Sequence, residues 1–250
     1  MIRPTITAHS GCEGTASGSM AAIVTGIELG ADIVEVDVRR VPGLGFVLSH
    51  DAVSGPAGLV TLEAAFAELK KHPGVGINCD LKVYGLAEDV LALADDCALA
   101  KGQLAFSGSL RPSELRANPA IARRAGVYLN IEEALAELYR ARHPEAAPAD
   151  EHAWDTVRGR VMEDFESWIE PLVDLCSSLP IRALNLPPQP FGPWLQRLGE
   201  AGARCSVWTI DESEAMRGFM AAPYIINLTT RRARLALDIR QAMRGKDRWS

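Results

Sequence analysis

The sequence lacks long apolar runs and paired cysteines, and each absence excludes a class of protein. No run of about 18 apolar residues occurs among the 250 residues, so we expect no membrane-spanning helix. The first residues, MIRPTITAHSG, have no apolar core of a secretory signal. The five cysteines form no CxxC pair, which favours reduced thiols over a disulfide framework or a zinc knuckle. We therefore expect a cytoplasmic protein.

An excess of positive charge is also absent. The chain has 26 Lys and Arg residues against 32 Asp and Glu residues, a formal net charge of −6. This balance argues against general binding to nucleic acid and against stable association with an anionic membrane. An anionic substrate would need a local positive centre, such as a metal ion. The composition leaves the oligomeric state open.

Short β-branched segments alternate with longer amphipathic segments along the whole chain. Strands are expected over 6–9, 32–38, 75–82, 103–109, 126–130, 181–186, 204–210 and 224–228. Helices are expected over 17–29, 61–72, 85–100, 111–125 (broken), 131–142, 161–179, 192–201, 212–221 and 230–243. Eight strands, each followed by helix, predict parallel strands with right-handed crossovers.

The count of eight and the chain length favour one α/β domain over residues 1–250, a TIM-type (β/α)₈ barrel. An open doubly wound sheet is the alternative, which the lack of a GxGxxG or P-loop after the first strand weakens. Residues 46–51 are expected to be a short extended piece after the second strand. Residues 143–160, rich in Pro, Ala and charge, are expected to be a surface excursion.

Polar residues gather where the predicted strands end, which is where a barrel has its active site. They are His9, Glu35, Asp37, His50, Asp51, Asp80, Lys82, Ser107, Asn130, Asn185, Trp208, Thr209 and Asn227.

Two charged pairs within strands are the most informative of these. Glu35 and Asp37 are two residues apart and face the same side of a strand, as do Asp80 and Lys82. Charges in an otherwise apolar strand are costly unless they are paired or bound to metal. Three converging carboxylates favour a hard divalent cation, Mg²⁺ or Ca²⁺. A salt-bridge network at the barrel rim is the alternative interpretation.

Two histidines close strand-like segments at the same end of the barrel. His9 and His50 can divide acid and base work at neutral pH. The other three histidines are interpreted as solvated surface residues.

The blocks AHSGCEGT, GADIVEVDVRRVPGLGFVLSHD, NCDLK and VWTI together resemble the glycerophosphodiester phosphodiesterases. More distantly, the chain resembles the phospholipase-D-type venom sphingomyelinases that share their barrel. The positions that match the family pattern are His9, Gly11, Glu13, Thr15, Glu35, Asp37, His50, Asp51, Asp80, Lys82, Trp208 and Thr209.

The resemblance implies a metal-dependent phosphodiesterase that hydrolyses a glycerophosphodiester or a related small phosphodiester to an alcohol and a phosphomonoester. It implies that one divalent cation is held by Glu35, Asp37 and Asp80, with Glu13 nearby as a further contact. The implied acid and base are His9 and His50. The implied substrate contacts are Lys82 on the phosphate and Trp208 as a wall of the pocket.

The chain departs from the family pattern in three places. Ser10 stands where the family has an arginine, Gly14 stands where it has an asparagine, and most of the family insertion after Asp51 is missing. Candidates to replace the missing cation are Arg39, Arg40 and Arg111. A non-catalytic barrel that binds a phosphorylated ligand is therefore an alternative, and a barrel lyase with Lys82 as base is another.

Overall fold

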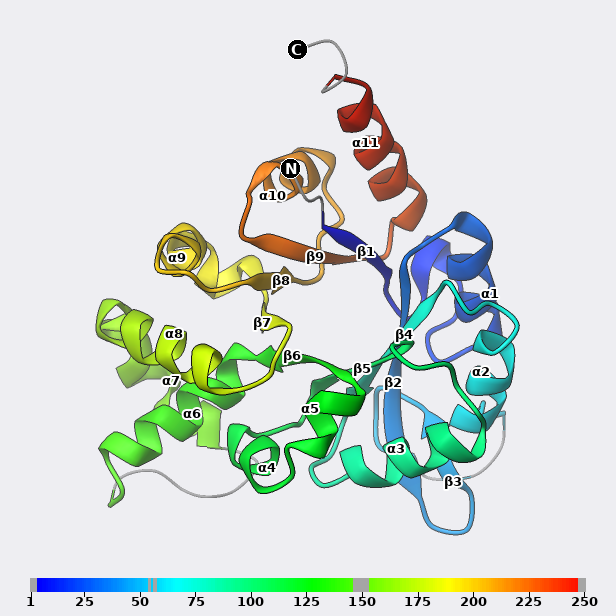
Figure 1. Cartoon of the computed structure of the whole chain (residues 1–250), viewed down its shortest axis with the longest axis horizontal. Coiled ribbons are helices and arrows are strands. Elements are labelled where there is room, and N and C mark those ends of the chain that lie inside the picture. The colour runs from blue at the N-terminus through cyan, green and yellow to red at the C-terminus, as the bar shows by residue number, and fades with distance from the viewer. Residues whose placement is uncertain (1–3, 54, 56–57, 146–152, 247–250) are drawn as a thin grey trace.

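Eight parallel strands close into a barrel. The structure, a computed structural model, describes residues 4–53, 55, 58–145 and 153–246. The barrel strands are β1 (Thr5–Ala8), β2 (Ile33–Val41), β4 (Gly76–Leu81), β5 (Leu104–Gly108), β6 (Gly126–Asn130), β7 (Ala183–Leu186), β8 (Cys205–Val207) and β9 (Ile225–Thr230). They pair in this order, and β9 pairs with β1, so the ring is complete (Figure 1). The predicted TIM-type barrel is confirmed.

The short extended piece after β2 is a ninth strand outside the ring. β3 (Gly45–Leu48) pairs antiparallel with the end of β2, from Val38 opposite Leu48 to Val41 opposite Gly45. Beyond the hairpin, the backbone N–H of Ser49 donates to the Asp37 carbonyl at 3.0 Å. The hairpin thereby returns the chain, and His50 with it, to the place where β2 carries Asp37.

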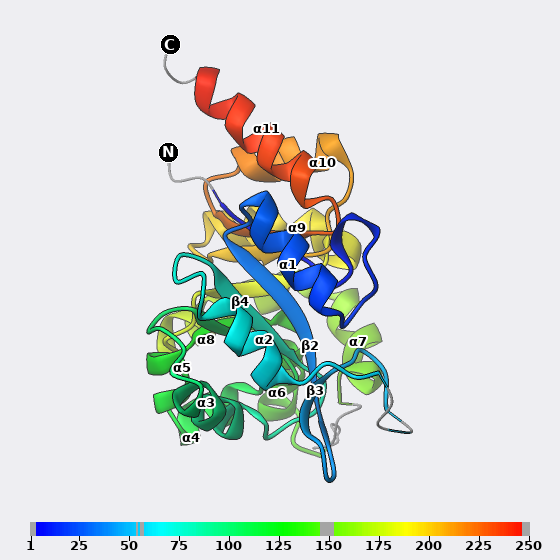
Figure 2. The ribbon, with the colours of Figure 1, turned by 90° about the vertical axis from the view of Figure 1, so that its right-hand side faces the viewer.

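Helices surround the barrel, as Figures 1 and 2 show for α1 and α2 on the outer side of β2. The α-helices are α1 (Met20–Leu29), α2 (Leu62–Leu69), α3 (Ala87–Asp96), α4 (Pro112–Ala117), α5 (Ala120–Arg124), α6 (Ile131–Arg142), α7 (Ala153–Glu163), α8 (Ile169–Ser178), α9 (Pro188–Glu200), α10 (Ser213–Ala221) and α11 (Ala233–Lys246). The short 3₁₀ helices are η1 (Cys12–Gly14) and η2 (Phe165–Trp168). Among the described residues, no helix combines the length and the apolar character that a bilayer crossing requires.

The two faces of each strand have different surroundings. On β2, Val34, Val36 and Val38 are buried in the main apolar cluster beneath the helices. The opposite face begins with Ile33, which clusters with Ala105, Tyr128 and Ala183 from three other strands. Because successive side chains alternate, this second cluster lies inside the barrel. Two residues further along the same face come the polar residues Glu35, Ser107, Asn130 and Asn185.

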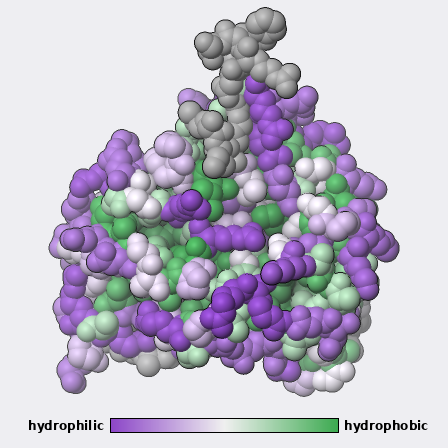
Figure 3. Space-filling view, viewed as in Figure 1, coloured by the Kyte–Doolittle hydropathy of each residue, from purple (hydrophilic) through white to green (hydrophobic). Residues whose placement is uncertain are grey.

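The surface shows how hydrophilic and hydrophobic residues are distributed over the molecule. Figure 3 shows hydrophilic residues along much of the outline of the face seen in Figure 1, and hydrophobic residues mixed with hydrophilic ones nearer its middle. The helices thus present polar side chains to solvent and apolar side chains to the barrel, as amphipathic helices on a single core do.

The segment expected as a surface excursion is shorter than predicted. Residues 146–152 lie outside the described residues, but α7 begins at Ala153 and packs against α6. Val157 and Val161, four residues apart, are both buried, which gives α7 one apolar face. The Pro, Ala and charged residues of the segment obscured this helical spacing. Strand β8 also ends earlier than expected, so Trp208 and Thr209 follow the strand.

Candidate active site

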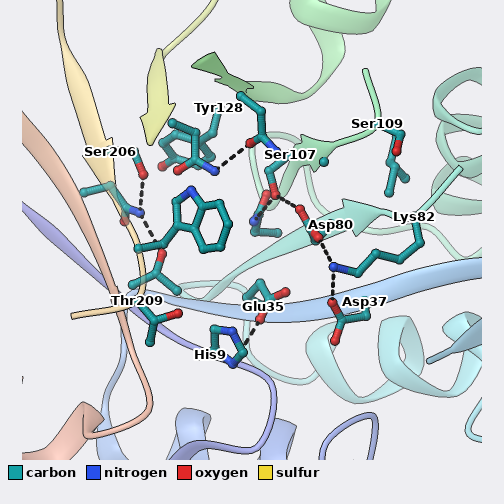
Figure 4. A pocket seen from close by; sticks show the side chains of 18 of the residues that line it. His9, Glu35, Asp37, Asp80, Lys82, Ser107, Ser109, Tyr128, Ser206 and Thr209 are labelled. Carbon is teal, nitrogen blue, oxygen red and sulfur yellow. Dashed lines mark hydrogen bonds and ion pairs between the residues drawn. The ribbon is translucent and has the colours of Figure 1, made fainter. Parts of the chain in front are cut away.

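A polar cavity of about 370 Å³ opens at the carboxyl ends of the barrel strands (Figure 4). Seven of the eight predicted site residues line it: His9, Glu35, Asp37, His50, Asp80, Lys82 and Trp208. The polar strand ends Ser107, Asn130, Asn185, Thr209 and Asn227 line it as well. The structure thus brings these side chains together at one end of the barrel.

Three carboxylates meet at one side of the cavity. Glu35 and Asp37 come from β2, and Asp80 on β4 is the register partner of Asp37. One oxygen from each carboxylate lies within 4.8 Å of the others. Glu35 is only 7% exposed and Asp37 only 3%. Two buried carboxylates and one half-buried carboxylate at this spacing fit a hard divalent cation.

The electrostatics of Glu35 support this interpretation. Burial, together with repulsion from Asp37 and Asp80, raises the pKa of Glu35 to about 8. The backbone N–H of Ser10 donates to Glu35 Oε2 at 2.7 Å and opposes this shift only in part. A bound cation would favour the ionised carboxylate and reverse the rise in pKa.

Lys82 bridges the other two carboxylates. Its Nζ donates to Asp37 Oδ1 at 2.7 Å and to Asp80 Oδ2 at 2.5 Å (Figure 4). Burial opposes the charged form of Lys82, but attraction to Asp80 and Asp37 outweighs burial and raises its pKa, so the ammonium stays charged. Behind this pair, Ser107 Oγ donates to Asp80 Oδ1 at 2.6 Å, and Asn78 Nδ2 donates to Ser107 Oγ at 2.9 Å.

His9 follows β1 and lies beside Glu35. Its Nδ1 is 3.8 Å from Glu35 Oε2 and donates to the Ser10 carbonyl at 2.6 Å. Burial is the largest influence on this imidazole and lowers its pKa, so the ring is neutral at pH 7. With the proton on Nδ1, the other ring nitrogen, Nε2, is a proton acceptor.

His50 is far more open to solvent than His9. Its side chain is 67% exposed, and Nδ1 donates to Asp51 Oδ1 at 2.9 Å. Arg39 holds the backbone of His50 by donating from two nitrogens to its carbonyl at 2.9 and 3.1 Å. This imidazole therefore has a carboxylate partner and free access to the cavity mouth.

Glu13 is the predicted site residue that is not among the described residues lining the cavity. It is exposed, and its Oε1 accepts a hydrogen bond from the backbone N–H of Arg234 at 3.0 Å. Arg234 lies in the first turn of α11, so Glu13 satisfies a free backbone donor at a helix N-terminus.

The structure adds residues that the sequence interpretation missed: Asn78, Ser109, Tyr128, Glu133, Ser206, Thr229 and Arg231. Five of them lie two residues from a strand-end residue already identified, so the period of two predicts the same face for each pair. They are Asn78, Ser109, Tyr128, Ser206 and Thr229.

The three arginines considered as replacements for the missing cation have other partners. Arg39 binds the His50 carbonyl, Arg40 Nη1 donates to Asp89 Oδ2 at 2.6 Å, and Arg111 lies 3.8 Å above the Tyr84 ring. None of the three is among the described residues that line the cavity.

No protein-family model matches the chain, and no curated protein matches its sequence. Solved structures do match. The chain is similar over 98% of its length to a glycerophosphodiester phosphodiesterase from Parabacteroides distasonis, of which it covers 98%, with a TM-score of 0.63 and 18% identity. The barrel has the fold of the glycerophosphodiester phosphodiesterases.

Two further structures support the same assignment of fold. A glycerophosphodiester phosphodiesterase from Thermotoga maritima matches 94% of this chain and 98% of its own, with a TM-score of 0.63 and 19% identity. An Oleispira antarctica phosphodiesterase in complex with the product sn-glycerol-3-phosphate matches 96% of this chain and 97% of its own, with a TM-score of 0.63 and 16% identity. The fold implied by the sequence resemblance is thus confirmed.

Proposed function

We propose that the chain is a metal-dependent phosphodiesterase that hydrolyses a glycerophosphodiester or a related phosphodiester to an alcohol and a phosphomonoester. The observation that carries this proposal is the meeting of Glu35, Asp37 and Asp80 within 4.8 Å of one another in a cavity that two histidines also line. The likeness to phosphodiesterase structures, one of them with sn-glycerol-3-phosphate bound, supports the choice of substrate class.

One divalent cation, Mg²⁺ or Ca²⁺, would be held by Glu35, Asp37 and Asp80. When bound, such a cation offsets charge on the phosphate oxygens. The carboxylates repel one another, and this repulsion together with burial raises the pKa of Glu35 to about 8. A bound cation would offset this repulsion, so the three residues fit one. Lys82 stays charged beside the same oxygens and would contact the phosphate.

The two histidines have complementary surroundings, and we assign them different roles. His9 Nε2 would take the proton from the attacking hydroxyl, because burial keeps this imidazole neutral. His50 Nε2 would give a proton to the departing alcohol oxygen, and Asp51, 2.9 Å from Nδ1, would orient the ring. A new P–O bond forms as the P–O bond to the leaving alcohol breaks.

A hydroxyl of the substrate next to the phosphate would be the first nucleophile. It would form a cyclic phosphate, which water then opens to the phosphomonoester. In this scheme Trp208 walls the pocket. The cavity of about 370 Å³ and the net charge of −6 favour a small phosphodiester over nucleic acid. The five free cysteines support a cytoplasmic location.

The proposal is tested by incubating the protein with glycerophosphocholine, a lysolipid and bis(p-nitrophenyl) phosphate. Each substrate is offered with Mg²⁺, with Ca²⁺ and with EDTA. Turnover of at least one substrate that appears with a metal and stops with EDTA is the expected result. Absence of metal-dependent turnover on all three would refute the proposal.

A barrel that binds phosphate esters without turnover is the second candidate. The exposed position of His50 and the serine at position 10 favour it, since both weaken the proposed chemistry. Calorimetry separates the two functions. Binding of Mg²⁺ and then of sn-glycerol 3-phosphate, without turnover of any diester, would support the non-catalytic barrel.

A further inference from the structure

The cavity carries more negative than positive side chains, although the proposed substrate is an anion. Of the described residues that line it, Glu35, Asp37, Asp80 and Glu133 are carboxylates, and Lys82 and Arg231 are permanent cations. The Lys82 ammonium is already shared between Asp37 and Asp80 at 2.7 and 2.5 Å. The four carboxylates outnumber Lys82 by three charges, and a divalent cation would offset only two of them. A bound phosphodiester therefore needs one further cation.

The loop after β1 does not supply this cation. Ser10 is 4% exposed, and its hydroxyl makes hydrogen bonds within the loop. Its Oγ lies 2.9 Å from Ser17 Oγ and accepts a hydrogen bond from the Gly18 N–H at 3.0 Å. The side chain thus fixes the conformation of the loop and has no contact with the cavity.

Arg231 lies directly beside this loop, at the end of β9. The backbone N–H of His9 donates to the Thr230 carbonyl at 2.9 Å, and that of Glu13 donates to the Arg231 carbonyl at 2.7 Å. The two hydrogen bonds hold Arg231 next to the segment that carries His9. Its side chain lines the same cavity as His9.

The guanidinium of Arg231 retains donors for a ligand. Its ion pair with Asp211 is loose, with Nη1 3.7 Å from Oδ2, and the side chain is 57% exposed. A guanidinium has five N–H donors in a planar fork that suits phosphate oxygens. The neighbouring Arg232 donates instead to the Asp211 carbonyl at 3.2 Å and is not among the described residues lining the cavity.

We infer that Arg231 is the second phosphate-binding side chain of this site, on the His9 side of the cavity, and that it supplies the cation which Ser10 does not. The inference rests on the proposed phosphodiesterase function. It identifies a binding residue at the end of β9.

The test measures binding of sn-glycerol 3-phosphate by calorimetry at saturating Mg²⁺, with Arg231→Gln, Arg231→Lys and the matched control Arg232→Gln. We expect Arg231→Gln to weaken binding by about tenfold or more, because a charge-assisted hydrogen bond is lost. Arg231→Lys should fall between Arg231→Gln and the wild type. The control should stay within about twofold of the wild type. Mg²⁺ affinity without the ester should not weaken in Arg231→Gln, a result that general damage to the site would not give.

Two negative outcomes are distinguishable. Equal ester binding by Arg231→Gln and Arg232→Gln, with diester turnover by the wild type intact, overturns the inference and leaves the proposed function standing. A wild type that neither binds the ester nor hydrolyses any diester overturns both. Thermal unfolding of each variant checks that this exposed substitution leaves the fold unchanged.

Discussion

The two sides of the cavity differ in charge although both lie at the carboxyl ends of the barrel strands. On one side, Asp37 pairs in register with Asp80, and Asp80 with Ser107. On the other side, the register partners are Asn130 and Asn185, then Asn185 and Ser206. The same end of the barrel therefore carries carboxylates on β2 and β4 and neutral amides and hydroxyls on β6 to β8.

The two sides also differ in how well their polar groups are satisfied. On the neutral side, Asn185 Nδ2 donates to Asn130 Oδ1 at 2.9 Å, and Asn227 Nδ2 donates to Ser206 Oγ at 3.0 Å. On the charged side, the pKa of Glu35 rises to about 8 because burial and its neighbours disfavour its charge. The amides of the neutral side thus have hydrogen-bond partners, although the buried Trp208 Nε1 has none among the described residues. The carboxylates of the charged side call for a cation. We therefore expect chemistry on the charged side and recognition of the alcohol on the neutral side.

The largest effect is expected for Asp80→Asn. It removes one proposed cation ligand at constant volume and should abolish metal-dependent turnover, a loss of at least about 10⁴-fold. Steady-state kinetics measures the loss of turnover, and Mg²⁺ calorimetry measures the loss of cation binding that should accompany it. Asp89→Asn, the same change at an exposed ion pair with Arg40, is the control and should leave both unchanged. Retention of turnover by Asp80→Asn would place the chemistry elsewhere.

His9→Ala should lower turnover by roughly 10²–10⁴-fold, because the variant lacks the proton acceptor. Mg²⁺ affinity should stay intact, because the three carboxylates remain. Since burial lowers the pKa of His9 below its ordinary 6.5, kcat/KM of the wild type should fall only below that pH. A pH profile from 5 to 9 checks this, and the acidic limb should vanish in the variant. His72→Ala, at a half-buried histidine beside Glu68, is the control. Equal losses in both variants would contradict the role.

Glu35 should make the metal-free protein pH-sensitive. Its folded-state pKa of about 8 lies above the ordinary 4.5, so its contribution to stability is present below pH 4.5 and is lost as pH rises through 8. The gain in free energy of unfolding on Glu35→Gln should therefore be larger at pH 9 than at pH 4 by about 2–4 kcal/mol. Urea unfolding at both pH values measures it. The exposed control Glu88→Gln should show no such difference, and an equal gain at both pH values would argue against a strained carboxylate.

The smallest effect is expected on the neutral side. Asn185→Ala removes the hydrogen bond to Asn130 and should raise KM by about tenfold or less, with kcat and Mg²⁺ affinity little changed. Asn118→Ala, outside the cavity, is the control. A large loss of kcat or of metal binding in Asn185→Ala would erase the distinction between the two sides.

Much of this site follows from the strand period alone. The two-residue spacing of Glu35 and Asp37, and of Asp80 and Lys82, predicts a shared face for each pair, and the structure brings all four together. The register that sets Asp80 opposite Asp37 depends on how two strands far apart in the sequence pair, and it cannot be predicted from a local sequence pattern. Lys82, which the resemblance implied as a phosphate contact, also bridges two carboxylates, as the alternative of a salt-bridge network at the barrel rim expected.

Other features depended on tertiary contacts that the sequence does not reveal. Arg231 is one of three arginines in RRAR, and only the pairing of β9 with β1 brings it beside the loop of His9. Helix α7 was missed because composition suggested a loop, although the spacing of Val157 and Val161 was a signal for it. Glu13 matched the family pattern, yet its side chain satisfies a donor of α11.

The most direct test of the account is anomalous diffraction from crystals grown with Mn²⁺, which takes the same oxygen ligands as Mg²⁺. The account predicts a single strong peak in the cavity, within bonding distance of one oxygen each from Glu35, Asp37 and Asp80. A cavity without a peak, with the Lys82 ammonium still bridging Asp37 and Asp80, would contradict it.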